Sequence, residues 1–474
     1  MRIRSGADYV ASLRDHRTVW LDGEKVEDIA GHPSLKATVG AFARYYDLMN
    51  DPKNDDLLQF ESPLTGEKAS IFLQPPRSRE ELAKRGRALE FVMREFGGLL
   101  TRLPDYDQGI MVGLLAVEDE FGVEDKAFPS NIESWYARML RENLMSVTAF
   151  NDPQVDRGKG LGDQGALRVI EKRSDGVLVR GARTLTTNAP FANDLVCLRK
   201  PVGPDGSDFC IDCIIPVDAD GIQMICRPSL RGGETSKTEL TGAPFDELDA
   251  IVVFDDVLIP KENVFMLGRP DIISKTWGTV TGWSPYHDLL RSVVKAELLL
   301  GVTSLIVDYI GTSKFPAVGE DLTEMIEYVE TLRTFARASE AQAFVTPRGL
   351  VAPNKQVLDI AKFYHHRFYP RMISLMHNLS GQSLVSSPTE PYFEREELLP
   401  YLEKYFGGSN VSAKEKAKLF RLGWRIACDG FGGRQIMYEL FNAATERTLR
   451  ERLIKSYDRS SFVAMAKKVA GIGN

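Results

Sequence analysis

A segment with the pattern of β-strands separates two long helical segments in this chain. Between Gly165 and Phe265, apolar and polar residues alternate with period two, which is typical of half-buried strands. Asp175 and Gly176 stand between two such runs and predict a tight hairpin turn. The residues on both sides of this segment follow helical spacing. Helical, β and helical layers can hold a flat cofactor where they meet, and this order indicates an enzyme.

Length and charge limit the classes of protein further. A chain of 474 residues exceeds what one core usually supports, so we expect domains at residues 1–147, 148–275 and 276–474. With 59 basic and 66 acidic residues the net charge is −7, which argues against a surface for nucleic acid. There is no run of eighteen apolar residues and no apolar leader. We therefore expect a cytoplasmic protein without a membrane span.

Two of the five cysteines form a CxxC pair, Cys210 and Cys213. Residues three apart lie on opposite sides of a strand, and neither a second CxxC nor a nearby histidine completes a zinc set. We predict that these cysteines are buried apolar residues and that the protein has no metal site.

Glycines at positions 158, 160 and 162 form a GxGxG run. A dinucleotide fingerprint needs a strand before the glycines and a helix after them. Here a strand pattern follows the run instead. The glycines therefore predict a mobile loop beside a ligand rather than a Rossmann site.

The C-terminal segment contains four long stretches with helical spacing, at residues 285–311, 321–344, 354–379 and 412–428. Ser412 and Glu415 form a capping box at the start of the last of them. Long helices joined in this way predict an antiparallel bundle.

Seven sequence segments, in this order and at these spacings, are specific for one family. They are SPLTGEKASIFLQPPRSREEL from Ser62, RLPDY at 102–106, DPQVDR at 152–157, DGVLVRGARTLTTNAPFANDL at 175–195, FDELDAIVVFDDVLIPKENVF at 245–265, HNLSGQSLVSSPTEPYF, and DGFGGRQIMYELFN at 429–442. With them the chain resembles the two-component, reduced-flavin-dependent aromatic hydroxylases. That family includes the 4-hydroxyphenylacetate 3-monooxygenase large component and the chlorophenol 4-monooxygenases. The resemblance covers nearly the whole chain.

The resemblance implies an α+β, acyl-CoA dehydrogenase-like fold with an N-terminal helical domain, a central β-barrel and a C-terminal four-helix bundle. Relatives of this kind are homotetramers or dimers, and we expect a homotetramer. It also implies a reaction. FADH2 from a separate NAD(P)H:flavin reductase reacts with O2 to give a flavin C4a-hydroperoxide, which hydroxylates a substituted phenol at the ortho or para carbon. Such chemistry needs a dry flavin site, a base for the phenol and a cation beside the phenolate.

Three residues match the catalytic positions of this family: Arg102, Tyr106 and His287. If a helix begins at Leu103 or Pro104, Arg102 and Tyr106 can face one cavity, because proline is favoured in the first helical turn. The resemblance implies that Arg102 neutralises the phenolate or the oxygenated flavin and that Tyr106 binds the substrate. His287 matches the base of the chlorophenol enzymes. On the residues alone, Arg102 could instead pair with nearby aspartates at the surface, and His287 could be a structural histidine paired with its neighbour.

One position departs from the family pattern. The 4-hydroxyphenylacetate enzymes have a substrate-binding histidine where this chain has Thr148. A threonine cannot act as a base at neutral pH. We therefore expect His287 to be the base, Thr148 to line the substrate site, and the substrate to be a phenol of the chlorophenol-like branch or of a biosynthetic relative.

The flavin-binding residues implied by the resemblance are Gln154, Arg157, Thr187, Arg434 and Asn442. Amide and hydroxyl groups can bond the flavin ring, and arginines suit its pyrophosphate. On the residues alone, Arg157 and Arg434 could be ordinary ion-pair partners.

Two other functions fit the same fold pattern. A flavin-dependent CoA-ester dehydratase would need cysteines for an iron–sulfur cluster near positions 102 and 106 and after the histidine, and this chain has none there. A CoA-ester dehydrogenase and a non-catalytic scaffold are the remaining alternatives.

Overall fold

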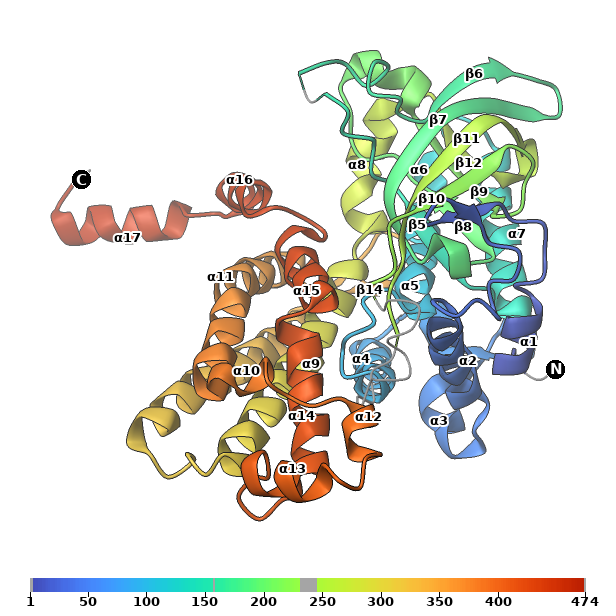
Figure 1. The fold of residues 1–474 in the computed structure, drawn as a ribbon. Coiled ribbons are helices and arrows are strands. Elements are labelled where there is room, and N and C mark those ends of the chain that lie inside the picture. Colours follow the sequence, from blue (N-terminus) through green and yellow to red (C-terminus); the bar gives the residue numbers. More distant parts are fainter. Residues whose placement is uncertain (1–2, 157, 231–244, 473–474) are drawn as a thin grey trace.

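Along the chain, most strands of the two larger sheets come between an N-terminal and a C-terminal set of helices, as the sequence predicts, and the C-terminal helices lie to one side of the sheets (Figure 1). The computed structural model describes residues 3–156, 158–230 and 245–472. The first part holds the elements α1 Gly6–Ala11, β1 Val19–Leu21, β2 Glu24–Lys25, α2 Lys36–Asn50, η1 Pro52–Asn54, α3 Asp55–Leu58, β3 Gln59–Glu61, β4 Lys68–Ser70, η2 Ile71–Leu73, α4 Arg79–Glu95, α5 Pro104–Leu115, α6 Glu118–Phe121 and α7 Ala127–Glu142.

The central part supplies most of the strands. Its elements are β5 Ser146–Ala149, β6 Arg168–Lys172, β7 Gly176–Thr187, η3 Ala189–Phe191, β8 Asp194–Cys197, η4 Pro204–Phe209, β9 Ile211–Pro216, β10 Ile222–Cys226, β11 Asp249–Pro260, η6 Lys261–Asn263 and β12 Val264–Leu267. A six-stranded sheet has the order β2-β1-β10-β11-β7-β6, and a four-stranded sheet has the order β12-β9-β8-β5. Strand β1 joins β10 in parallel, so the N-terminal part completes the larger sheet.

The predicted hairpin is confirmed, because β6 and β7 are antiparallel neighbours joined across Asp175. Gly176 begins β7 where a Cβ atom would lie 2.1 Å from the carbonyl oxygen of Ile259 on β11. Only glycine permits this approach of two backbones. Cys210 and Cys213 are both fully buried.

The C-terminal part is helical apart from one short hairpin. Its elements are α8 Pro270–Val280, α9 Ser284–Tyr309, α10 Pro316–Ala341, β13 Phe344–Val345, β14 Val351–Ala352, α11 Lys355–Ser380, η7 Gly381–Leu384, α12 Glu390–Phe393, α13 Leu399–Tyr405, α14 Ala413–Ala427, α15 Gly430–Phe441, α16 Glu446–Ser456 and α17 Ser460–Ala470. Helix α9 packs against α10, α11 and α14. The Ser412 hydroxyl accepts a hydrogen bond from the backbone N–H of Glu415, which is one of the two bonds of the predicted capping box of α14, while the Glu415 carboxylate accepts a bond from Tyr309.

Helix α17 extends away from the rest of the chain, and every one of its residues is exposed (Figure 1). We call α16 and α17 together the C-terminal arm.

Among the described residues, no helix is long and apolar enough to cross a membrane. The helix–sheet–helix architecture is confirmed, whereas closure into a β-barrel, a four-helix bundle and the domain boundaries at 147 and 275 remain predictions.

A buried carboxylate joins the C-terminal helices. Glu439 on α15 is fully buried and accepts two bonds from Arg291, at 2.6 and 2.8 Å, and one from Lys295 at 2.6 Å, both on α9. His365 on α11 lies 2.9 Å from the same carboxylate. Burial alone would favour the neutral acid, but these cations hold the pKa of Glu439 well below its usual range.

Replacing Glu439 with Gln should destabilise the protein strongly, because Arg291 and Lys295 would become buried cations without a counter-charge. We expect the free energy of unfolding to fall by about 3–5 kcal/mol, measured by urea denaturation. The matched control is Glu324→Gln, which breaks the exposed Arg371–Glu324 pair and should change stability little. An equal effect of both substitutions would contradict the prediction.

Candidate active site

Arg102 and Tyr106 meet at the start of α5. The helix begins at Pro104, so Tyr106 lies in its first turn and Arg102 lies just before it. The Arg102 guanidinium stacks 3.6 Å from the centre of the Tyr106 ring. At Gly113, a Cβ atom on α5 would lie 1.9 Å from the carbonyl oxygen of Val280, so glycine allows α5 to pack closely on α8. The predicted convergence of Arg102 and Tyr106 is therefore present.

His287 on α9 faces the same turn of α5. Its imidazole contacts the Tyr106 ring edge to face, with centroids 5.2 Å apart. Its Nε2 atom lies 2.8 Å from Oδ2 of Asp105, and its Nδ1 atom lies 3.9 Å from Oδ1 of Asp288. Burial disfavours the imidazolium, but these two carboxylates outweigh burial and raise the pKa of His287 above its ordinary value.

A polar chain links Arg102 to the neighbour of His287. Arg102 Nη2 donates to Asn442 Oδ1 at 2.9 Å, and Asn442 Nδ2 donates to Asp288 Oδ2 at 2.7 Å. Arg102 Nη1 also lies 3.5 Å from the hydroxyl of Thr148, on β5. Side chains from four separate segments of the chain thus contribute to one cluster, which we call the Arg102–His287 cluster: Arg102, Asp105, Tyr106, Asp107, Thr148, His287, Asp288 and Asn442.

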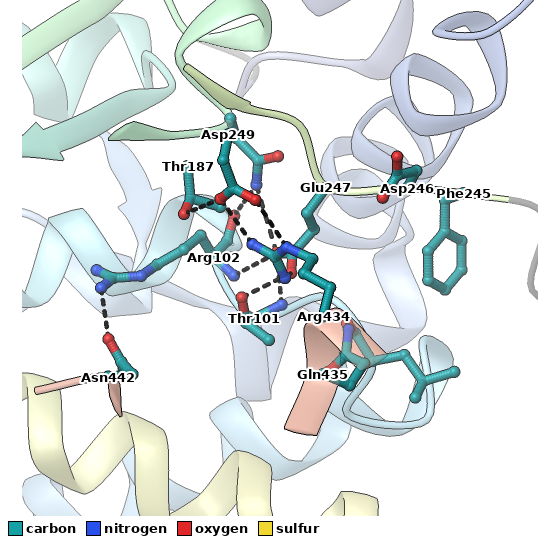
Figure 2. A network of polar contacts seen from close by, with 12 residues as sticks. Thr101, Arg102, Thr187, Phe245, Asp246, Glu247, Asp249, Arg434, Gln435 and Asn442 are labelled. Carbon is teal, nitrogen blue, oxygen red and sulfur yellow. Dashed lines mark hydrogen bonds and ion pairs between the residues drawn. The ribbon is translucent and has the colours of Figure 1, made fainter. Parts of the chain in front are cut away.

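A second network holds Arg102 in place from the opposite side (Figure 2). Glu247 is fully buried and accepts bonds from the backbone N–H of Thr101 at 2.6 Å and of Arg102 at 2.8 Å. Arg434 on α15 donates to Glu247 at 2.7 Å and makes two bonds of 2.9 Å to Asp249. Thr187 on β7 donates to the same Asp249 at 2.7 Å. The larger sheet and α15 are therefore both tied to the residue that precedes α5.

The electrostatics of the cluster favour proton exchange near neutral pH. Burial raises the pKa of Asp107 to about 7, against the opposing effects of Arg102, Thr148 and His287. Burial likewise raises the pKa of Tyr106 to about 12. For Asp288, burial is outweighed by His287 and nearby cations, which lower the pKa of its carboxyl. Titratable groups whose pKa values are moved in opposite directions inside one buried site are typical of acid–base chemistry.

Several buried polar atoms of the described residues have no hydrogen-bond partner, and a group of them gathers here. They are Arg102 Nε, Asp105 Oδ1 and Oδ2, Ser284 Oγ, both ring nitrogens of His287, Asp288 Oδ1, Lys362 Nζ and Tyr438 OH. Unsatisfied buried polar atoms carry a cost that a polar ligand can remove. Their mixture of donors and acceptors, with a guanidinium and an imidazole, fits a phenol hydroxyl and the polar edge of a flavin ring.

Some of the site residues predicted from the sequence belong to this cluster, some are linked to it by hydrogen bonds, and some lie away from it or outside the described residues. Arg102, Tyr106, Thr148, His287 and Asn442 belong to it. Thr187 and Arg434 are linked to it through Asp249 and Glu247, so the guanidinium of Arg434 is bound by carboxylates (Figure 2). Gln154 is exposed in the loop after β5. Arg157 lies outside the described residues.

Three acidic residues of the cluster were not predicted as functional. The sequence suggests Asp105 and Asp107 only as surface partners of Arg102, but they are 1% and 3% exposed, and Arg102 bonds to Asn442 instead. It suggests Asp288 only as a structural partner of His287. The signal in the sequence was an acidic residue on each side of a tyrosine in a first helical turn, together with an acidic residue directly after the candidate base.

Comparison with protein families gives one result for the whole chain. Residues 5–266 match the model of the 4-hydroxyphenylacetate 3-hydroxylase N-terminal region, and residues 279–471 match that of its C-terminal region. The 4-hydroxyphenylacetate 3-monooxygenase oxygenase component of Thermus thermophilus is 30% identical over 97% of this chain and 95% of its own length. The 4-nitrophenol 4-monooxygenase/4-nitrocatechol 2-monooxygenase oxygenase component of Rhodococcus opacus is 30% identical over 100% and 92%.

Solved structures agree with this result. A crystal structure of a 4-hydroxyphenylacetate 3-monooxygenase oxygenase component complexed with FAD superposes with a TM-score of 0.92, at 29% identity and with 98% of each chain covered. An archaeal 4-hydroxybutyryl-CoA dehydratase from N. maritimus, at 24% identity, superposes with a TM-score of 0.91 over 100% of this chain and 96% of its own. That second likeness shows a common fold and nothing further.

The Asp107→Asn variant should gain stability relative to the unchanged protein as the pH rises. In the unfolded chain an aspartate loses its proton near pH 3.9, roughly, whereas burial delays this loss in the folded protein to about pH 7. Between these pH values, ionisation therefore favours the unfolded state of the unchanged protein only. We expect the stability difference between variant and unchanged protein to grow by on the order of 1–4 kcal/mol from pH 4 to pH 8.

Urea denaturation at several pH values measures this difference. The control is Asp56→Asn, at an exposed position in α3, for which the difference should not depend on pH. A pH-independent difference for Asp107→Asn as well would rule out the assignment.

Proposed function

The chain belongs to the 4-hydroxyphenylacetate 3-hydroxylase family, and we infer from this membership that it is the oxygenase component of a two-component, FADH2-dependent aromatic monooxygenase. The observation that carries this inference to individual residues is the convergence of Arg102, Tyr106 and His287 in one buried polar cluster. A cation, a phenolic hydroxyl and a base at one place are what hydroxylation of a phenol needs.

FADH2, when bound, would supply the electrons that activate O2, and O2 is the source of the oxygen atom that enters the aromatic ring. The residues of this chain prepare the ring for that attack. We propose that His287 removes the proton of the substrate hydroxyl and that the Arg102 guanidinium stabilises the resulting phenolate. Tyr106, held against both groups, donates a hydrogen bond that orients the substrate. The buried surroundings exclude water, which strengthens these interactions.

We propose that Gln154, Arg157, Thr187, Arg434 and Asn442 form the flavin site. Asn442 is supported by its direct contact with Arg102. Arg434 and Thr187 both bond to Asp249. We therefore propose that they support the flavin site indirectly, by fixing the segment that holds Arg102, and that the Arg434 guanidinium does not itself bind the flavin.

The substrate that we propose is a substituted phenol of the kind named for the nitrophenol enzyme of Rhodococcus opacus and for a 2,4,6-trichlorophenol monooxygenase. Thr148 supports this choice, because it lies at 3.5 Å from Arg102 where the 4-hydroxyphenylacetate enzymes are expected to have a histidine. A threonine leaves proton removal to His287.

A flavin reductase is the implied partner, because an oxygenase component of this type depends on a second protein for reduced flavin. We also propose a homotetramer, supported by the exposed apolar side chains of α17, among them Phe462, Val463, Met465 and Val469. Finer features of the fold are proposals too: a central β-barrel over residues 148–275 between domains 1–147 and 276–474, a C-terminal four-helix bundle, and an acyl-CoA dehydrogenase-like architecture as a whole.

The CoA-ester dehydratase remains the second candidate because of its common fold. The absence of cysteine at and near Arg102, Tyr106 and His287 argues against the iron–sulfur chemistry of that class. The free cysteines of the described residues lie at 197, 210, 213, 226 and 428.

Replacing His287 with Ala should slow hydroxylation about 100-fold or more, because a positioned base contributes roughly 10²–10⁴-fold. The assay combines the protein, a flavin reductase, NADH, FAD and a panel of nitro-, chloro- and carboxymethyl-substituted phenols, and measures hydroxylated product. Anaerobic titration with FADH2 should give the same affinity for the variant as for the unchanged protein. Product at the unchanged rate would remove the assignment of His287 as base. No product from any phenol with the unchanged protein, although FADH2 binds, would contradict the proposed function.

A further inference from the structure

The two ring nitrogens of His287 have different surroundings. Nε2 faces the Asp105 carboxylate on α5 at 2.8 Å, and both residues are at most 3% exposed. Nδ1 faces Asp288 at 3.9 Å, beyond hydrogen-bond distance. Asp288 is the end of the polar chain that runs through Asn442 to Arg102. The Nδ1 side is therefore the side that faces the polar chain to Arg102, and it is there that the proposed function places the phenol.

The Asp105 carboxylate has no other close ionic partner among the described residues. No lysine or arginine there lies within 4.0 Å of it, and neither of its oxygens has an aligned hydrogen bond. Its contact with Nε2 is an ion pair by distance rather than an aligned bond. Catalytic hydrogen bonds are often poorly aligned before the substrate binds.

We propose that Asp105 is a positioning residue for His287: it keeps a proton on Nε2 and thereby leaves Nδ1 free to accept the proton of the substrate hydroxyl. This proposal rests on the proposed function. In the step itself the O–H bond of the phenol breaks, an N–H bond forms at Nδ1, and the electron pair stays on the phenolate oxygen beside Arg102. The imidazole becomes an imidazolium, and its charge is balanced by the Asp105 carboxylate at the opposite nitrogen. A neutral imidazole has only one proton, so the group that fixes this proton decides which nitrogen is the base.

The charged and titratable groups around this pair come from several elements. Tyr45 on α2 and Arg85 on α4 act on Asp105, and Tyr106 and Asp107 lie on the same helix as Asp105. Asp288 acts on His287 from its own helix. Of these groups, the carboxylates at 105, 107 and 288 favour the imidazolium when ionised, and Asp105 is the one in contact with a ring nitrogen at hydrogen-bond distance.

A helix-end role is the competing explanation for a buried Asp105. It directly follows Pro104 in the first turn of α5, where a negative charge stabilises any helix. The chain offers a matched control, because Asp271 directly follows Pro270 in the first turn of α8 but is paired with Arg269 at the surface. Asp271→Asn removes the same helix-end interaction without affecting His287.

The test measures hydroxylation as a function of pH with Asp105→Asn, Asp271→Asn and the unchanged protein, each with reductase, FADH2 and a saturating phenol. Loss of the carboxylate lowers the pKa of His287, since that carboxylate favours its charged form. We expect the ascending limb of the kcat profile to move to lower pH by about one unit, and kcat at its optimum to fall about 10- to 100-fold. KM for the phenol should change much less than kcat. Asp271→Asn should leave the profile in place.

An unmoved limb in Asp105→Asn, with or without lower activity, would overturn the proposal. Asp105→Glu keeps the carboxylate and covers the case in which the amide variant does not fold. The ascending limb of its kcat profile should lie at the same pH as in the unchanged protein. A limb displaced to lower pH would contradict the role of Asp105 as the positioning residue. Failure of the underlying proposals is recognised separately: the proposed function fails if the unchanged protein hydroxylates no phenol, and the role of His287 as base fails if His287→Ala retains full hydroxylation, whatever the Asp105 variants do.

Discussion

The structure depends on the pairing of charges that are buried where α15 passes between the helices and the larger sheet. On one side of this helix Glu439 is held by Arg291, Lys295 and His365. On the other side Arg434 is held by two carboxylates of the segment that leads into β11. Buried ions without partners are unstable, so the two sets of pairs allow α15 only one position. The C-terminal part and the sheet are fixed relative to each other by this requirement.

The same buried ion pairs around α15 also position the residues of the Arg102–His287 cluster. The Glu247 carboxylate accepts hydrogen bonds from the Arg434 guanidinium and from the backbone N–H groups of Thr101 and Arg102. The start of α5 is therefore placed by an ion pair with α15, and α15 ends at Asn442, the side-chain partner of Arg102. Precision of this kind suits the role that we propose for the cluster, in which a guanidinium and an imidazole act on one small hydroxyl group.

Local patterns in the sequence predict the parts of the site that depend on local structure. Pro104 marks the start of a helix and so predicts that Arg102 and Tyr106 lie together, while the order of strands and helices predicts the layers. The contact between Arg102 and Asn442 joins residues 340 positions apart, and the one between Asp105 and His287 joins two helices. Rules of residue spacing apply within one helix or strand and cannot predict contacts between residues so far apart in the sequence. Resemblance to a family could suggest Asn442 and Arg434, but not that the guanidinium of Arg434 is bound by Glu247 and Asp249.

Asn442 is also the residue from which the C-terminal arm departs. Helix α16 begins only four residues later, and α17 continues outward beyond it. Helix α16 itself packs against α11, where Arg452 bonds to Asp359, and the residues of α17 beyond it are all exposed. Only residues 443–445 separate α16 from Asn442, so a surface that bound the C-terminal arm would lie close along the chain to the amide that binds Arg102.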